Sequence, residues 1–292
     1  GLARTIRWET MFSLSDTGLL AFQSRSGGDV SHLVVLGRDG RELGKVGKPA
    51  DYRDLALSHD GRRVAVAVPD ATTQKSDIWL LDRERGTSTR LTFDPEEDNS
   101  PVWSPDDRYV YFFSRRQGGG DVFRKLSSGI GADELVFADA EMTMLRSLTG
   151  DGTRGALMTR AVSTKTVWDI QLLNLADKKA TPLLQTPFSE GNPLLTRDGK
   201  WMAYQANDSG KFEVYVQRLD GEGGKWQIST DGGTRARWSR GEKELVFQTP
   251  DNKLLAVDVE LWPTFSASVP RPFLDPGIRP GAGYQFDVSG GG

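Results

Sequence analysis

Short apolar runs alternate with polar, glycine-containing turns along the whole chain. The clearest runs are Arg63–Val68, Ile78–Asp82 and Tyr109–Phe113, which are rich in Val, Ile and aromatic residues. Such residues favour strands. No apolar stripe of period 3.6 and helical length separates these runs, so units of strand, helix and strand are not expected. The pattern predicts an all-β protein.

One turn motif recurs between these runs at a nearly fixed interval. It begins with Ser or Thr at positions 15, 58, 104, 149, 196 and 239, and these starts differ by 43, 46, 45, 47 and 43 residues. We call the Ser or Thr at these positions the anchor residue. Four short strands, A to D, fit into each interval, and strand A ends at the anchor. A repeat of this length with four strands is typical of a β-propeller.

The residues before each anchor separate into two classes. The residue one before the anchor is always large and apolar: Leu14, Leu57, Trp103, Leu148, Leu195 and Trp238. The residue two before it is mixed: Ser13, Ala56, Val102, Ser147, Leu194 and Arg237. Because alternate residues of a strand point to opposite faces, we expect the first set to pack between blades and the second to line a central channel. Trp103, Trp238 and the strand-C residue Trp79 are therefore predicted to be structural.

The repeats predict a single β-propeller domain over residues 1–292, with six blades of four antiparallel strands. The expected repeats span about residues 10–53, 54–98, 99–144, 145–191, 192–234 and 235–283. Residues 284–292 are interpreted as the start of a further repeat or a ring-closing strand, followed by a glycine tail. Seven blades are the alternative, if Leu2–Trp8 and Tyr284–Val288 pair into a composite blade.

The composition limits the kinds of partner and cofactor that this chain is expected to bind. The chain has 292 residues, a net charge of −3 and scattered Lys and Arg, which argues against nucleic acid. No apolar run is long enough for a membrane-spanning helix. Cysteine is absent, which excludes disulfides and thiolate metal sites but leaves the compartment open. The missing initiator Met indicates a piece of a longer protein. No cofactor is expected.

Acidic residues precede strand C in several repeats, including Asp77 and Asp121. We interpret them as structural residues that satisfy nearby loop donors rather than as a metal site, because repeats would hold them apart around a ring. The acidic segment 94–99 lacks the Gly and closing Glu of a calcium loop. A solvated loop is the preferred interpretation, and a bound metal is not expected.

Catalytic motifs are missing from the chain. There is no G-x-S-x-G, H-E-x-x-H, G-x-x-x-x-G-K or G-x-G-x-x-G. His32 and His59 are the only histidines, and neither has an obvious nucleophile partner. The sequence therefore predicts a non-enzymatic protein.

Binding is expected where loops gather on a propeller face, because such loops carry function on a rigid scaffold. B–C loops and D–A connections emerge on the same face, which predicts a protein- or peptide-binding surface there or at its channel mouth. Arg115 and Arg116 can also simply pair with the acidic segment 94–99. The candidate binding residues are Asp54, Asp98, Asn99, Arg115, Arg116, Asn192, Asn207, Asp208 and Arg235.

Several segments resemble a known family. Arg90–Phe93, Asn99–Asp106, Tyr111–Arg115 and Ser76–Asp82 resemble the TolB-like, WD-repeat-like propeller motif of bacteria, over about residues 12–289. Phe12–Ala21, Glu213–Val216 and Gly224–Thr230 resemble the propeller region that follows the transmembrane helix of bacterial Ser/Thr protein kinases.

This resemblance implies a sensor or interaction module of a larger protein, in the periplasm or otherwise outside the cytoplasm, although a cytoplasmic location stays open. Two alternatives remain. One is the gating propeller of a prolyl-oligopeptidase-like hydrolase, where the same repeat occurs. The other is a propeller that binds a small ligand or a cation at its channel mouth.

Overall fold

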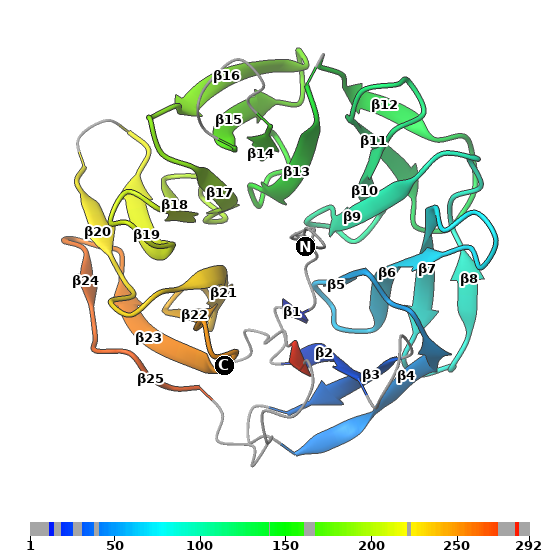
Figure 1. Ribbon diagram of the computed structural model, residues 1–292, viewed down its shortest axis with the longest axis horizontal. Helices are drawn as coiled ribbons and strands as arrows, with labels where there is room; N and C mark the ends of the chain where they lie inside the picture. The colour runs from blue at the N-terminus through cyan, green and yellow to red at the C-terminus, as the bar shows by residue number, and fades with distance from the viewer. Residues whose placement is uncertain are drawn as a thin grey trace, which may run out of the picture.

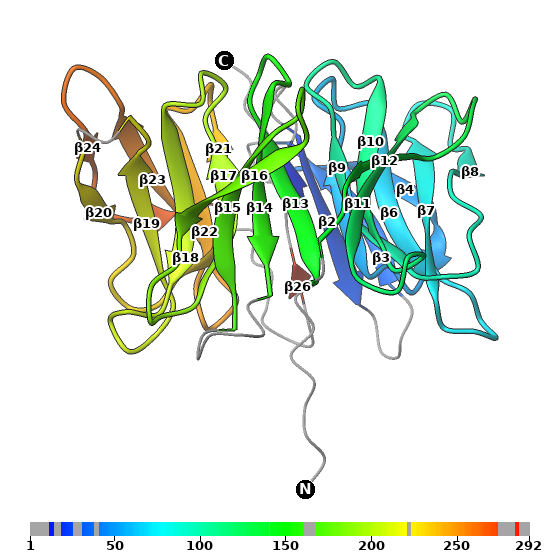
Figure 2. The ribbon, with the colours of Figure 1, turned by 90° about the horizontal axis from the view of Figure 1, so that it is seen from above.

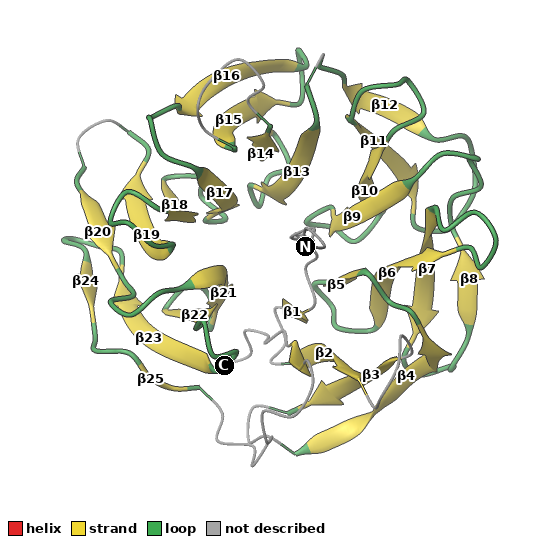
Figure 3. Cartoon of the chain, in the orientation of Figure 1, coloured by secondary structure: helices red, strands yellow, loops and turns green. Residues whose placement is uncertain are grey.

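The structure, a computed structural model, describes residues 12–14, 19–25, 31–37, 41–139, 141–160, 167–220, 223–273 and 284–285. All regular elements in these residues are β-strands (Figure 3). In chain order they are β1 (Phe12–Leu14), β2 (Leu20–Arg25), β3 (Ser31–Leu36), β4 (Glu42–Ala50), β5 (Asp54–Leu57), β6 (Arg63–Pro69), β7 (Ser76–Asp82), β8 (Ser88–Arg90), β9 (Asp98–Trp103), β10 (Tyr109–Ser114), β11 (Asp121–Leu126), β12 (Glu134–Phe137), β13 (Thr143–Leu148), β14 (Arg154–Thr159), β15 (Asp169–Asn174), β16 (Lys179–Leu184), β17 (Glu190–Leu195), β18 (Trp201–Ala206), β19 (Glu213–Arg218), β20 (Lys225–Gln227), β21 (Thr234–Ser239), β22 (Glu244–Gln248), β23 (Leu254–Glu260), β24 (Ser266–Ala267), β25 (Arg271–Pro272) and β26 (Tyr284–Gln285).

The strands form antiparallel sheets arranged as blades around a central axis (Figure 1). Five blades use four successive strands each: β5–β8, β9–β12, β13–β16, β17–β20 and β21–β24. The first strand of each is innermost and the fourth lies at the rim (Figure 1). Since each strand pairs with its neighbour in sequence, the order A, B, C, D repeats from the axis outwards.

The remaining sheet corrects the expected architecture. It contains β1–β4, and β26 from the other end of the chain pairs with β2, so its inner edge is shared by two distant segments. The prediction of six uniform four-stranded blades is therefore wrong, because five blades follow that pattern and β25 further extends one of them by pairing with β23. The seven-bladed alternative is also wrong, because β26 joins this sheet instead of starting another. Leu2–Trp8 lies outside the described residues.

The strands run between two faces of the ring, seen edge-on in Figure 2. In an antiparallel blade, the A–B and C–D turns lie on one face, and the B–C loops and D–A connections on the other. We call these the A–B face and the B–C face. The described residues contain no helix that is long and apolar enough to cross a membrane.

The repeated A–B turn is held by local side-chain hydrogen bonds. Ser104 Oγ donates to Asp106 Oδ1 (2.6 Å) and accepts from the Tyr109 N–H (2.8 Å), while Asp106 Oδ1 accepts from the Arg108 N–H (3.1 Å). Ser58, Thr149 and Thr196 make the corresponding bonds. Because Ser, Thr and Asp satisfy their own turn backbone in this way, the motif specifies the hairpin in these four blades.

The hydrophobic core is divided into clusters that lie between neighbouring blades. Leu33 and Val35 of β3, for example, pack with Leu55 of β5 and Val64 of β6. The residues one before the anchor in the five regular blades all pack in such clusters: Leu57, Trp103, Leu148, Leu195 and Trp238. Apolar burial thus joins blade to blade around the ring.

Candidate functional site

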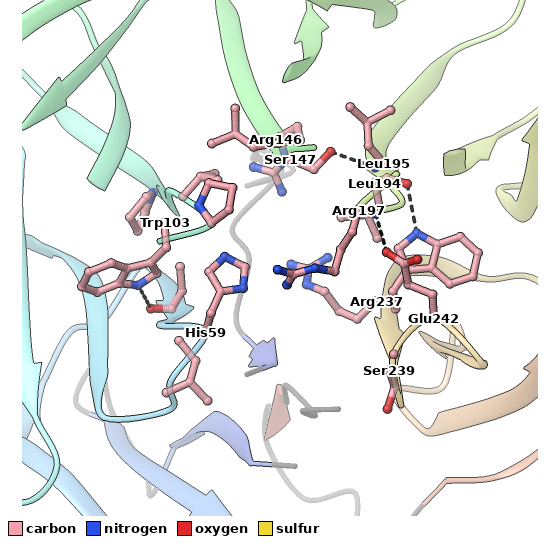
Figure 4. A pocket seen from close by; sticks show the side chains of 18 of the residues that line it. His59, Trp103, Arg146, Ser147, Leu194, Leu195, Arg197, Arg237, Ser239 and Glu242 are labelled. Carbon is pink, nitrogen blue, oxygen red and sulfur yellow. Dashed lines mark hydrogen bonds between the residues drawn. The ribbon is translucent and has the colours of Figure 1, made fainter. Parts of the chain in front are cut away.

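The structure contains a cavity of about 230 Å³ in the channel near the A–B face (Figure 4). We call it the A–B cavity. Its wall comes from the innermost strands β5, β9, β13, β17 and β21 and the turns that follow them. The lining residues are Leu55, Ala56, Leu57, His59, Pro101, Val102, Trp103, Pro105, Arg146, Ser147, Leu148, Leu194, Leu195, Arg197, Arg237, Trp238, Ser239, Gly241 and Glu242.

Two positions of the repeat supply much of this wall. The residues two before the anchor all line it in the five regular blades, as the alternation of strand A predicts: Ala56, Val102, Ser147, Leu194 and Arg237. The residue directly after the anchor lines it in three blades, as His59, Pro105 and Arg197. The repeat therefore turns equivalent positions into a ring of different side chains.

Bulges in the innermost strands alter this alternation. The registers of β9, β13, β17 and β21 against their partners are each interrupted. In three of them, a residue four before the anchor has positive φ: Ser100 (52°), Asn192 (49°) and Arg235 (52°). In β13 the bulge instead separates buried Leu145 from Ser147 and places Arg146 on the cavity wall. Bulges re-aim side chains in this manner.

Hydrogen bonds between blades fix the apolar part of the wall. Trp103 Nε1 donates to the Ala56 carbonyl (2.9 Å), and Trp238 Nε1 donates to the Leu194 carbonyl (3.1 Å). Ser147 Oγ accepts from the backbone N–H of Leu195 (3.0 Å). Each bond joins an innermost strand to the next one around the ring, so the wall is held rigid before any ligand arrives.

The A–B turns are joined to one another as well. Asp107 Oδ1 and Oδ2 accept from the backbone N–H groups of His59 and Asp60, each at 2.9 Å. Glu242 Oε1 accepts from the Arg197 N–H. Asp107 and Glu242 occupy the turn position, three after the anchor, that other blades fill with glycine, and their φ values are 55° and 69°. Both residues therefore have a left-handed backbone conformation, and their carboxylates hold the neighbouring turn in place.

Basic side chains outnumber acidic ones among the described residues that line the A–B cavity. Arg146, Arg197 and Arg237 line it together with His59, and Glu242 is the one acidic residue in that described part of the lining. Figure 4 shows the side chains of these basic residues directed into the cavity from different blades. The chain as a whole carries a net charge of −3, so this local excess of cations is opposite to the overall charge.

Arg146 belongs to a polar network that extends from the cavity wall into neighbouring blades. Burial lowers its pKa, an effect that the Asp54 carboxylate partly offsets. Its Nη2 donates to Asn192 Oδ1 (2.9 Å), and Asn192 Nδ2 donates to Gln205 Oε1 (3.0 Å). Gln205 Oε1 also accepts from the Arg235 N–H (3.1 Å). The structure thus brings the predicted residues Asn192 and Arg235 into one polar network with Arg146.

The candidate residues on the B–C face are engaged within the chain. Arg116 Nη2 lies 3.0 Å from an oxygen of the fully buried Asp98, and Arg116 Nη1 lies 2.7 Å from Asp133. Arg115 Nε lies 3.4 Å from Glu97. The arginines therefore pair with the acidic segment, which is one of the two outcomes that the sequence left open.

The other candidates lie at the starts of inner strands or in one loop. Asn99 is in β9, beside Asp98, and Asp54 begins β5. Asn207 Oδ1 accepts from the Ser189 N–H (2.8 Å), and Asp208 pairs with Lys225. None of the predicted binding residues lines the A–B cavity, whose lining includes residues of the turns on the opposite face.

The residues expected to be structural are placed as follows. Asp77 is buried, and Arg90 Nη2 lies 2.7 Å from its Oδ2. Asp121 is also buried, and burial raises the pKa of both carboxyls. Trp79 is half-buried against the cluster between the first two sheets. Among the described residues, no group of three or more His, Asp or Glu is placed to hold a metal ion.

The basic residues of the cavity are not among the binding residues that the sequence predicts. The alternation of strand A predicts that Arg237 lines the channel, but it does not distinguish Arg237 or His59 as a binding residue. Arg197 follows an anchor just as His59 does, so comparing that position across repeats could have found both. No signal in the sequence identifies Arg146, because its placement depends on the bulge in β13.

Comparisons with known proteins agree with the fold. No family model matches the chain. It is 23% identical over 210 residues to an uncharacterized peptidase, YuxL, of Bacillus subtilis, covering 56% of this chain and 31% of that protein. It is 24% identical over 167 residues to the Tol-Pal system protein TolB of Helicobacter pylori, covering 56% of this chain and 39% of the relative.

A solved structure extends the likeness to nearly the whole chain. The crystal structure of TolB from Acinetobacter baumannii superposes with a TM-score of 0.69 at 17% identity, covering 93% of this chain and 66% of that one. The fold is therefore that of a TolB-like β-propeller. The chain spans less than half the length of the curated relatives it matches.

Proposed function

We propose that this chain is a non-enzymatic interaction module that binds a protein or peptide partner at the A–B cavity. The observation that carries this proposal is the cavity itself, a concave wall fixed by hydrogen bonds between blades at Trp103, Ser147 and Trp238. A preorganised wall binds a ligand at little cost in side-chain ordering. The B–C face is the less favoured surface, because Asp98, Arg116 and Asp208 are paired within the chain.

The hydroxyl groups in the wall support a binding role over a catalytic one. Ser147 Oγ donates to the Pro193 carbonyl (3.1 Å) and accepts from the Leu195 N–H. Ser239 is buried, with 2% of its surface exposed. A nucleophile needs a base within hydrogen-bond reach and access to substrate, and Ser147 is engaged with the backbone of β17 instead.

Site-specific photo-crosslinking tests this proposal. A photoreactive amino acid replaces Arg197 at the A–B cavity in one variant and Arg115 on the B–C face in a second. Both are exposed to extract from the source cells, and crosslinked peptides are identified by mass spectrometry. One recurring partner at position 197 and none at 115 is expected. Crosslinks confined to position 115 would move the binding surface to the B–C face.

The larger context is part of the same proposal. We infer that the propeller is the extracytoplasmic part of a bacterial receptor such as a membrane-anchored Ser/Thr kinase, on the strength of the segments Phe12–Ala21 and Gly224–Thr230. The complete reading frame tests it. A kinase domain and a membrane-spanning helix upstream are expected, and a reading frame without either would refute this assignment.

The partial likeness to a peptidase supports one second candidate, a propeller that gates access to a hydrolase domain. In that case the rest of the protein must contain a nucleophile elbow with its Ser, Asp and His. The same reading frame distinguishes the two candidates, and hydrolysis of a peptide substrate by the full-length protein would favour the second.

A further inference from the structure

We propose that a proton bound at Glu190 holds the β17–β20 blade against the β13–β16 blade, and that this contact loosens when the proton leaves. The two blades are neighbours in the ring (Figure 1). Glu190 is the first residue of β17, and its backbone N–H donates to the carbonyl of Trp168 (2.9 Å), which directly precedes β15. The carboxyl group is therefore carried by a residue that joins one blade to the other.

The Glu190 carboxyl group is buried and incompletely paired. The residue is 2% exposed. Its Oε1 accepts a hydrogen bond from the Thr186 hydroxyl, whereas no donor of the described residues reaches the buried Oε2. An ionised carboxylate only accepts hydrogen bonds, and burying one without donors is costly. A protonated carboxyl group is uncharged and supplies a donor of its own. These surroundings therefore favour the protonated form.

The lack of a paired cation distinguishes Glu190 from other buried carboxylates of the ring. Asp98 lies 3.0 Å from Arg116 Nη2, and Glu244 lies 2.8 Å from Arg271 Nη2. Within the part of the chain that the structure describes, Glu190 forms no ion pair of this kind. Because an unpaired buried charge is far more costly than a neutral group, ionisation destabilises this contact more than it does a paired site.

The charged groups around Glu190 come from several elements. Asp169 begins β15 and acts on Glu190 as a like charge. Lys225 of β20 acts on it as an opposite charge, but Lys225 is paired with Asp208 of the β18–β19 loop. The other titratable neighbours in the same sheet are Tyr204 of β18 and Glu213 of β19.

The balance of these effects sets the direction of the switch. Burial raises the pKa of Glu190 above its ordinary value of 4.5, and the Asp169 carboxylate raises it further, while Thr186 and Lys225 oppose the shift without cancelling it. A raised pKa in the folded state means that the folded chain holds this proton more tightly than the unfolded chain. The stabilisation from Glu190 is therefore present at low pH and is lost as the pH rises through the folded-state pKa.

The strand that Glu190 begins also contributes to the A–B cavity. Further along β17, Leu194 and Leu195 belong to the lining. The switch thus acts on a strand that the proposed function uses, but its test needs no binding partner. Its failure would leave the proposed function standing, and a failure of the crosslinking experiment would leave the switch standing.

Amide hydrogen exchange of the whole chain tests the proposal at the bond between the blades. The protection factor of the N–H of residue 190, which is corrected for the intrinsic effect of pH on exchange, is followed by NMR from about pH 5 to about pH 8. The wild type is expected to lose protection as the pH rises. Glu190→Gln, whose amide replaces the protonated acid, is expected to keep it. A level profile in the wild type, or an equal loss in Glu190→Gln, would overturn the proposal.

Two further variants localise the effect. Glu96→Gln is the matched control, because it removes the same group from the connection between β8 and β9 and is expected to leave the wild-type profile unchanged. Asp169→Asn removes the neighbouring negative charge and is expected to weaken the pH dependence. Loss of the pH dependence in Glu96→Gln would contradict a switch at Glu190.

A direct titration keeps the proposal testable if a variant does not fold. The carbon-13 NMR shift of the Glu190 carboxyl carbon in the wild type gives the midpoint of its ionisation. A midpoint above the ordinary value of 4.5 is expected. A midpoint at or below that value would overturn the proposal, because the folded chain would then hold the proton no more tightly than the unfolded chain.

Discussion

Replacement of Trp103 by alanine tests whether the propeller is held together between its blades. The side chain is 3% exposed and packs in the cluster between the β5–β8 and β9–β12 blades, while its Nε1 donates to the Ala56 carbonyl. Truncating a buried Trp costs about 3–5 kcal/mol. The carbonyl left without its donor adds to that cost by about 1–3 kcal/mol.

The measured quantity is the free energy of unfolding, from urea denaturation followed by tryptophan fluorescence and circular dichroism. We expect Trp103→Ala to lower it by about 4–8 kcal/mol. Trp103→Phe retains most of the ring volume and removes the donor, so a loss of about 1–3 kcal/mol is expected. That pair of variants separates packing from the hydrogen bond.

Trp238 provides the matched control. It is the equivalent residue of the β21–β24 blade and makes the equivalent hydrogen bond to Leu194, but its side chain is only half-buried. Because folding removes less apolar surface from water at Trp238 than at Trp103, Trp238→Ala is expected to cost less than Trp103→Ala. Equal losses, or a larger loss at Trp238, would refute the argument that burial between blades sets the stability.

Three further predictions concern other contacts. Arg116→Gln leaves the fully buried Asp98 without its cation, and we expect it to lower the free energy of unfolding in urea by about 3–5 kcal/mol. Arg124→Gln, in a more exposed pair, is expected to lower it by only about 0–1 kcal/mol. Similar losses in the two variants would contradict this. Hydrogen bonds to Asp151 lower its pKa to about 2, so the stabilisation that this carboxylate provides is present above the ordinary pKa near 3.8 and is lost as the pH falls toward 2. The difference in Tm between the wild type and Asp151→Ala should therefore shrink over that pH interval. A constant difference in Tm would be contrary evidence. Asp107→Gly keeps a backbone suited to positive φ and removes the acceptor of two N–H groups, so faster amide hydrogen exchange at residues 59 and 60 is expected, and unchanged exchange would argue against the link between turns.

Local chemistry explains why much of the fold follows from sequence. The pair Ser104 and Asp106 determines its turn through bonds that span at most five residues, so no tertiary information is needed. The same holds for the alternation that directs Val102 to the channel and Trp103 to the space between blades. Such signals recur in each repeat, and their recurrence reveals the propeller.

The parts of the fold and of the site that the sequence does not predict depend on contacts between distant residues. Arg146 lies on the cavity wall because the register of β13 against β14 is interrupted. The apolar periodicity of the sequence does not indicate that bulge. The partition of the first sheet depends on β26 reaching β2, across more than 250 residues of sequence. Arg116 could be paired or free by sequence alone, and only its packing against Asp98 decides between them.

The divided inner edge of the first sheet has a consequence for biosynthesis. Since Tyr284 and Gln285 pair with Ser24 and Gln23, the ribosome must deliver every residue up to Gln285 before this edge can be completed. Until then the nascent chain presents unpaired backbone groups of β2, which are prone to pair with other chains. A translation arrest shortly before Tyr284 should therefore yield a product that depends on chaperones, although the five other blades have already been synthesised.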